Sequence, residues 1–196
     1  MAAGLACAQK KCAAEDRLIV FIDESALSER PTRVRTWAPR GCTPIVRFHF
    51  HWRHVSAIAA LSSTGFAFRL FDGAVKSAQI IDFLKALRAQ TARKLLVIWD
   101  GAAQHKSRLM RDWLDSTDGA VQMALLPGYA PEINPVDYLW GWLKRHALAN
   151  FCPHSLAELK TAARNKLRSG QHRRSIIASC WKQAGLGECH EFGNSQ

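Results

Sequence analysis

Two short apolar runs, each followed by an aspartate, restrict the fold more than any other feature of the sequence. Leu18–Ile22 stops at Asp23, and Leu95–Trp99 stops at Asp100. Runs of five apolar residues that are rich in branched side chains predict strands buried on both faces of a sheet. We therefore expect a sheet that is covered by helices on both sides, with an acid at the end of each of two central strands.

The patterns around these runs complete a mixed α/β arrangement. Val55–Leu61 and Phe66–Phe71 flank a turn cluster, which predicts an antiparallel hairpin. Alternating apolar and polar residues over 46–53 predict a half-exposed basic strand, and Val121–Leu126 is a further strand candidate. Helical spacing of apolar residues predicts helices around 80–87, 109–114 and 136–143, one from Ser155 to about Ser169 and a short one around Ile176–Lys182.

The chain is expected to form one folded unit with short tails. Its 196 residues, 48% of them hydrophobic, are enough for one core. We assign 1–16 to an N-terminal tail, 17–169 to the folded domain and 170–196 to a basic C-terminal tail with a short helix. The absence of an apolar stretch of roughly 18 residues and of a signal peptide predicts no membrane association and an intracellular, soluble protein.

The charge balance predicts a polyanionic partner. There are 27 Lys and Arg against 16 Asp and Glu, a formal net charge of +11. A surplus of this size is typical of nucleic-acid binding, although a merely soluble basic protein is the alternative. The densest basic stretch near Asp23 is the candidate for contact with a DNA backbone, a solvated loop being the alternative. It contains Arg30, Arg33, Arg35 and Arg40 together with Trp37.

Cysteine and histidine spacing argues against a zinc or disulfide framework. The six cysteines contain no Cys-x-x-Cys pair, so we expect reduced thiols. Strand alternation would place His49 and His51 on one face, with His54 nearby, but no Cys or third ligand has a suitable spacing for zinc.

Asp23 and Asp100 are candidates for a cation site. In open α/β sheets, ligands collect beyond the carboxyl ends of the strands. If the two strands are neighbours, the two carboxylates repel each other and a divalent cation resolves the conflict. The alternative is that each aspartate is a turn or helix-cap residue.

Asp137 is the candidate for a third acid. Asn134 is a good N-cap and Pro135 a good first helical residue, which places Asp137 in the first turn of a helix, off its apolar stripe. The alternative is that this acid only complements the helix dipole.

Four ordered blocks of the sequence resemble the DDE transposases of the mariner-like superfamily, particularly their bacterial insertion-sequence branch. The resemblance spans roughly Arg17 to Ser169 and implies a ribonuclease H-like fold. It puts the three acids of that family on Asp23, Asp100 and Asp137, with Glu132 as a rival for the third. The blocks are Ile19–Ser25, Arg35–Gly41, Val97–Asp100 with His105–Ser107, and Leu126–Lys144.

The resemblance also implies a reaction and its partners. It implies two Mg²⁺ or Mn²⁺ ions and DNA cleavage and strand transfer in cut-and-paste transposition, by a homodimer or higher assembly on transposon ends and target DNA. His105 and Lys106 follow the second acid and are candidates to contact a phosphate, a surface pair at a helix start being the alternative. The expected location is the bacterial cytoplasm, at the nucleoid.

Three departures from the family pattern add alternatives. The third acid is usually Glu in the bacterial branch, and Gly101 stands where Asn is common. Relatives carry a helix-turn-helix domain before the catalytic domain, whereas about sixteen residues precede the first apolar run. We therefore expect a split element with a separate helix-turn-helix protein, or a truncated relic. A catalytically impaired DNA-binding remnant and another ribonuclease H-like nuclease are the alternative functions.

Overall fold

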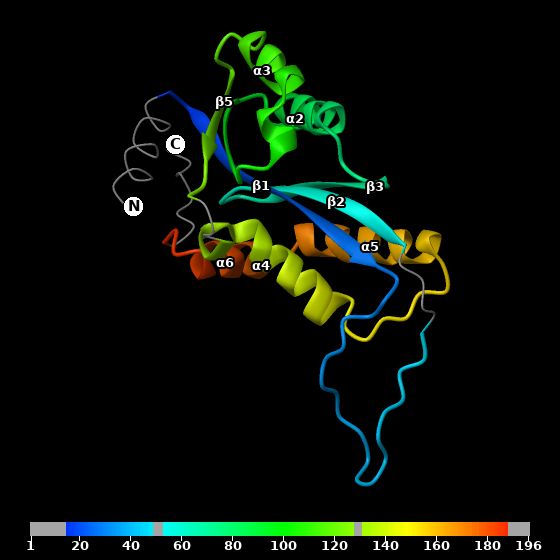
Figure 1. The fold of residues 1–196 in the computed structure, drawn as a ribbon. Helices are drawn as coiled ribbons and strands as arrows, with labels where there is room; N and C mark the ends of the chain where they lie inside the picture. Colours follow the sequence, from blue (N-terminus) through cyan, green and yellow to red (C-terminus); the bar gives the residue numbers. More distant parts are fainter. Residues whose placement is uncertain (1–14, 49–52, 128–130, 188–196) are drawn as a thin grey trace.

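A mixed five-stranded sheet forms the centre of the molecule (Figure 1). The computed structural model describes residues 15–48, 53–127 and 131–187. The strand order is β3-β2-β1-β4-β5, and β1 pairs antiparallel with β2 and parallel with β4. The strands are β1 (Arg17–Ser28), β2 (His54–Leu61), β3 (Phe66–Asp72), β4 (Lys94–Trp99) and β5 (Val121–Leu125).

Helices cover both faces of this sheet, as the apolar runs predict. One face carries α2 (Ser77–Thr91) and α3 (Arg108–Asp115). The other carries α4 (Pro135–Trp142), α5 (Leu156–Gln171) and α6 (Arg174–Gln183) (Figure 1). Three short turns complete the described part of the chain: η1 (Ala103–Lys106), η2 (Pro131–Ile133) and the π-helical η3 (Leu143–Ala147).

Strand alternation along β1 divides the core into two clusters. Val20 and Ile22 pack in the cluster under α2 and α3, whereas Phe21 and Leu27 pack in the cluster under α4, α5 and α6. Successive side chains of a strand point to opposite faces, so the same strand supplies both cores. This division also determines which acid of β1 faces which helices.

β1 continues beyond the aspartate at which the sequence predicts that it stops. Its pairing with β4 ends at Phe21, opposite Ile98, but its pairing with β2 continues from Asp23, opposite Ala59, to Ser28. β2, the antiparallel neighbour, continues to form backbone hydrogen bonds with β1 after β4, the parallel neighbour, has ended. Asp23 therefore lies within a strand, next to the point where β4 ends.

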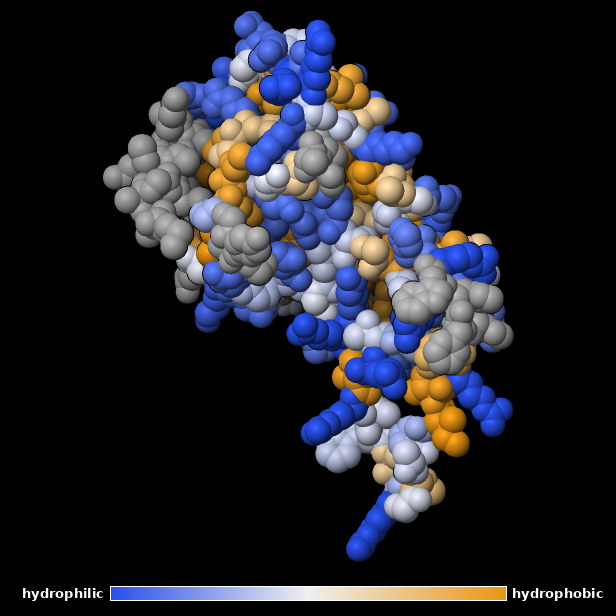
Figure 2. Space-filling model, viewed as in Figure 1, coloured by the Kyte–Doolittle hydropathy of each residue, from blue (hydrophilic) through white to orange (hydrophobic). Residues whose placement is uncertain are grey.

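An arm projects from the sheet between β1 and β2 (Figure 1). At its base, the buried Glu29 accepts two hydrogen bonds from Arg53, of 3.2 and 3.3 Å. The side-chain amide of Asn150 accepts a hydrogen bond from the Val34 N–H at 2.9 Å and donates one to the Val34 carbonyl at 3.0 Å. Beyond these contacts, hydrophobic and hydrophilic side chains are exposed, with Trp37 fully accessible (Figure 2).

The strand predicted over 46–53 is not found at residues 46–48 and 53, the part of this segment that the structure describes. Residues 46–48 and Arg53 have no regular secondary structure. His49 and His51, the residues considered for zinc, lie outside the described residues.

The segment expected as a C-terminal tail contains a core helix. α5 runs to Gln171, and α6 then buries Ile177, Cys180 and Trp181 against the rest of the core. The Trp181 ring meets the Phe21 ring of β1 edge to face, with centroids 5.6 Å apart. The expected boundary at residue 169 therefore falls inside a continuous helix, and the core extends through α6.

The start of α5 follows the predicted cap with one difference. The Ser155 hydroxyl accepts a hydrogen bond from the Glu158 N–H at 3.2 Å, as expected. The Glu158 carboxylate reaches back to the N–H of His154, at 2.7 Å, instead of that of Ser155. Within the described ranges, no helix is long and apolar enough to cross a membrane.

Candidate active site

Asp23 points from β1 towards α4. The indole Nε1 of Trp140 donates a 2.9 Å hydrogen bond to Asp23 Oδ2. Trp140 is itself 3% exposed and packs in the core under α4. A tightly packed ring therefore holds one oxygen of the Asp23 carboxylate in place.

Asp100 follows the last residue of β4, next to β1. Its Oδ1 accepts a hydrogen bond from the Ala102 N–H at 3.1 Å and lies 2.9 Å from Nδ1 of His105. The side chain is 57% exposed, so it borders solvent. Since β1 and β4 are parallel neighbours, their sequence positions bring Asp23 and Asp100 to one edge of the sheet.

Asp137 occupies the first turn of α4, as the sequence predicts. Asn134 caps the helix by accepting a 3.1 Å hydrogen bond from the Val136 N–H, and Pro135 is the first helical residue. Asp137 and Trp140 are three residues apart, a spacing that places them on the same side of a helix. One helix therefore supplies both an acid and the donor to Asp23.

The three acids interact electrostatically. Burial, followed by the charges of Asp137, Glu24 and Asp100, raises the pKa of Asp23 from 3.8 to about 7. Burial and the Asp100 charge also raise the pKa of Asp137, while Lys144 opposes that shift. The structure thus brings together the three acids that the sequence singles out, and burial together with the neighbouring charges makes Asp23 and Asp137 resist ionisation.

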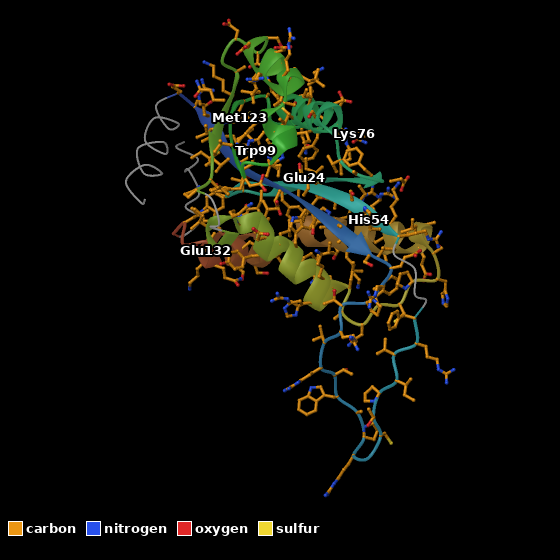
Figure 3. All side chains as sticks on the ribbon, viewed as in Figure 1. Glu24, His54, Lys76, Trp99, Met123 and Glu132 are labelled. Carbon is orange, nitrogen blue, oxygen red and sulfur yellow. The ribbon has the colours of Figure 1, made fainter. Side chains whose placement is uncertain are left out.

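Glu132, the rival third acid, lines a cavity together with Asp137. It is exposed in η2, and its backbone carbonyl accepts a 3.1 Å hydrogen bond from the Tyr138 hydroxyl. Figure 3 labels it near α6, well away from Glu24 on β1. The acids whose charges raise the pKa of Asp23 include Asp137 and do not include Glu132.

Glu24 and His105 form a pair that the sequence analysis did not find. His105 is 1% exposed, and its Nε2 lies 3.1 Å from Glu24 Oε1. Its ring stacks on Trp99 with a centroid distance of 3.9 Å and an interplanar angle of 6°. Burial tends to lower the pKa of His105, but Glu24 and Asp100 outweigh it, so the pKa is raised overall.

The burial of His105 corrects the expected phosphate contact. Both ring nitrogens face oxygens of the protein, and the ring has almost no accessible surface. Lys106, in contrast, is exposed beside the second acid. A Cβ atom at Gly101 would lie 3.0 Å from the Lys106 ammonium, so the glycine leaves room for this cation near Asp100.

Lys144 is a second functional candidate that was missed. Its Nζ donates a 2.7 Å hydrogen bond to Ser25 Oγ on β1. Desolvation lowers its pKa, while the charges of Asp23 and Asp137 act in the opposite direction, so the lysine lies near both acids. It is the second residue of a π-helical segment, a distortion that is frequent at functional sites.

Simple spacing signals exist for both missed residues. Glu24 directly follows Asp23 in a strand, so it must face the opposite side of the sheet. Lys144 follows Asp137 by seven residues, about two helical turns, so it lies on the same side of the helix.

The arginines expected to contact DNA are not grouped with the acids. Arg33, Arg35 and Arg40 are exposed on the projecting arm. They form a separate basic surface, carried by the arm.

The chemistry of the acids fits a hard divalent cation. Among the described residues, no three His, Cys, Asp or Glu side chains are arranged so that they could already hold a metal ion. The candidate ligands are nevertheless carboxylates, the ligand type that Mg²⁺ and Mn²⁺ prefer. The raised pKa values of Asp23 and Asp137 show that their negative charge is poorly compensated, and a cation would supply the compensation.

The raised pKa of Asp23 predicts that the metal-free protein loses stability as the pH rises from about 4 to about 7. The unfolded chain releases this proton near pH 3.8, whereas the folded chain keeps it until about 7. In that interval the unfolded state binds fewer protons, so rising pH favours unfolding; below it both states are protonated and the effect vanishes.

We expect the Asp23→Asn variant to be more stable than the unaltered protein above pH 7, by on the order of 3 kcal/mol. Thermal unfolding in EDTA at pH 4 to 8 measures the difference, which should close towards pH 4. Two curves that run parallel over this range would contradict the assignment of the raised pKa to Asp23.

Comparison with protein families shows which family the chain matches. The family described as DDE superfamily endonuclease matches residues 18–160. No curated protein sequence matches the chain.

Solved structures of transposases share the fold. The Mos1 strand transfer complex aligns with a TM-score of 0.67 and 19% identity over 93% of this chain and 55% of the Mos1 chain. The Mos1 mariner paired end complex with Mn gives the same TM-score and identity, over 93% and 56%. The catalytic domain of Mos1 mariner transposase gives 0.62 and 16%, over 93% and 82%.

At these identities the likeness is one of fold. The expected ribonuclease H-like architecture, a mixed sheet flanked by helices, is confirmed. The chain spans about 55% of the length of the Mos1 chain in the strand transfer complex.

Proposed function

The chain belongs to the DDE superfamily endonucleases, and from this premise we propose that it is the catalytic domain of a transposase that cleaves DNA and transfers the cut strand in cut-and-paste transposition. The observation that carries the proposal is that Asp23, Asp100 and Asp137 lie near one another: besides burial, the charges of Asp137 and Asp100 raise the pKa of Asp23, and the charge of Asp100 raises that of Asp137. These acids come from a strand, a strand end and a helix start, so only the fold brings them together.

In this proposal, Asp23, Asp100 and Asp137 hold two Mg²⁺ or Mn²⁺ ions. Such ions activate water or a DNA 3′-hydroxyl and stabilise the leaving oxygen. The Trp140 indole fixes the Asp23 carboxylate, and the His105 imidazole does the same for Asp100. Lys144 adds a positive charge beside Asp23 and Asp137, where a phosphate would also be attracted.

The structural neighbours support the metal and DNA parts of the proposal. Structures of the Mos1 mariner paired end complex include Mn in one case and Mg in another. The Mos1 transposase paired-end complex also contains the left transposon end. For the present chain, we propose transposon ends and target DNA as partners, and an assembly of two or more copies on that DNA.

A plasmid-nicking experiment tests the proposal. The purified chain is incubated with supercoiled DNA in Mg²⁺, in Mn²⁺ and in EDTA, and nicked product is expected with either metal and not with EDTA. Preference for an RNA–DNA hybrid would point to another ribonuclease H-like nuclease. Salt-sensitive DNA binding without cleavage in either metal would point to a remnant that has lost activity.

The arm supplies a second test, of DNA contact. We expect Arg33→Gln, Arg35→Gln and Arg40→Gln, combined in one protein, to weaken DNA binding and to reduce its salt dependence. Each lost phosphate contact lowers the slope of log K against log salt by roughly 0.9. Fluorescence anisotropy with a labelled duplex at several salt concentrations measures this slope.

A variant with the same loss of charge on the helices is the control. Arg88, Lys166 and Arg168 are exposed on α2 and α5. Changing these three to Gln is expected to alter the slope less than the arm variant does. Equal slopes for the two triple variants would mean that net charge, and not the arm, determines DNA binding.

A further inference from the structure

We propose that Glu24 and His105 form a positioning pair that holds the Asp100 carboxylate in the orientation needed to bind a divalent cation. The inference rests on the proposed function, because it assigns Asp100 to the cation site. It gives the two neighbouring acids of β1 different tasks: Asp23 as a ligand and Glu24 as an anchor for the residue that orients another ligand.

Strand geometry separates these two tasks. Asp23 shares a face of the sheet with Phe21, which packs under α4 to α6, and it receives the Trp140 indole from α4. Glu24 must then face the side of α2 and α3, where Ile22 packs. Its side chain therefore points away from α4, and its carboxylate contacts His105 on the side of α2 and α3.

The imidazole of His105 links Glu24 to Asp100. Nε2 lies 3.1 Å from Glu24 Oε1, while Nδ1 lies 2.9 Å from Asp100 Oδ1 and 3.2 Å from the Asp100 carbonyl. Both nitrogens thus face acceptors, and a carboxylate at each end fixes the rotation of the ring. Stacking on Trp99, which is 0% exposed, fixes its plane.

Asp100 needs such a partner because of its position. It follows the end of β4, its side chain is 57% exposed, and the hydrogen bond that its carboxylate accepts within the described residues comes from the Ala102 N–H. A functional ligand must be held within about 0.5 Å of its working position, which packing alone does not achieve for an exposed side chain. Loss of a residue that orients a metal ligand typically costs about 10- to 100-fold in metal affinity.

Calorimetric titration of the metal-free chain with Mn²⁺, in the absence of DNA, tests the pair without relying on activity. We expect Glu24→Ala and His105→Gln each to weaken Mn²⁺ binding by about 10- to 100-fold. The double variant should bind no more weakly than His105→Gln, because both residues act through one chain of contacts.

Two further variants separate position from charge. Glu24→Gln removes the charge but keeps an oxygen that accepts from the imidazole, so it should lose less affinity than Glu24→Ala. His105→Asn places an amide nitrogen near the position of Nδ1 and should recover part of the affinity that His105→Gln loses. Asp82→Ala removes an exposed negative charge from α2 and is expected to leave Mn²⁺ affinity unchanged.

Several results would overturn the proposal. Unchanged affinity in Glu24→Ala and His105→Gln would do so, as would equal losses in Glu24→Gln and Glu24→Ala, which would indicate a charge effect. If circular dichroism shows that Glu24→Ala does not fold, equal losses in His105→Asn and His105→Gln contradict the pair. Absence of Mn²⁺ binding by the unaltered chain would overturn the proposed cation site as well, whereas unaffected variants of a chain that binds Mn²⁺ overturn the positioning pair alone.

Discussion

Replacing Asp23 with Asn is expected to lower metal-dependent DNA nicking by roughly a thousandfold or more, because it removes a charged ligand from the proposed cation site. Asn keeps the shape of the side chain and can still accept the hydrogen bond from Trp140 Nε1. Asp100→Asn and Asp137→Asn should have effects of similar size. The measurement is the initial rate of plasmid nicking in Mg²⁺ and in Mn²⁺, with variants compared at equal concentration.

Two controls accompany the nicking measurement. Asp23→Asn is expected to be at least as stable as the unaltered protein above pH 7, so a loss of activity cannot then be attributed to unfolding. Glu132→Gln is the control acid, since Glu132 is exposed in η2, and it should retain activity. An active Asp137→Asn together with an inactive Glu132→Gln would transfer the third role to Glu132.

Trp181→Ala is expected to have the largest effect on stability, lowering the free energy of unfolding by about 3 to 5 kcal/mol. The ring is 6% exposed and packs edge to face on Phe21 of β1. Its removal leaves a cavity between α6 and the sheet, and α6 also packs against α4, the helix that carries Asp137. Urea unfolding followed by circular dichroism measures the change.

The neighbouring residue provides the control for this experiment. Lys182 is exposed on the same helix, and Lys182→Ala should change the free energy of unfolding by no more than about 0.5 kcal/mol. If the two variants unfold at the same urea concentration, α6 does not form part of the core, and the domain ends where the sequence analysis placed its boundary.

The elements that the sequence predicts well are those with a strong periodic pattern. The apolar run before Asp100 forms β4, the predicted hairpin is formed by β2 and β3, and the regularly spaced apolar residues lie in α2, α3 and α4. The described residues of the strand predicted over 46–53 form no strand, because alternation describes a side-chain pattern and supplies no partner strand. Residues 46–48 instead belong to an arm that leaves the sheet.

The C-terminal helix shows a different limit. Its short apolar pattern predicted a helix, but nothing in that pattern indicates whether the helix is attached to the core. Phe21 and Trp181 are 160 residues apart in the sequence, and only the packed structure shows that their rings meet.

The sequence by itself determined the sheet strands next to the acids and the helix start that presents Asp137, because these depend on local periodicity and capping. The choice of the three carboxylates as the site rests also on the family resemblance and stays a prediction. The tertiary structure decided what surrounds those acids. β1 continues past Asp23 because β2 stays paired with it, Trp140 and Lys144 reach the acids from α4 and η3, and His105 turns inward to join Glu24 with Asp100. Such contacts depend on strand order and helix packing, which bring together residues from distant parts of the chain.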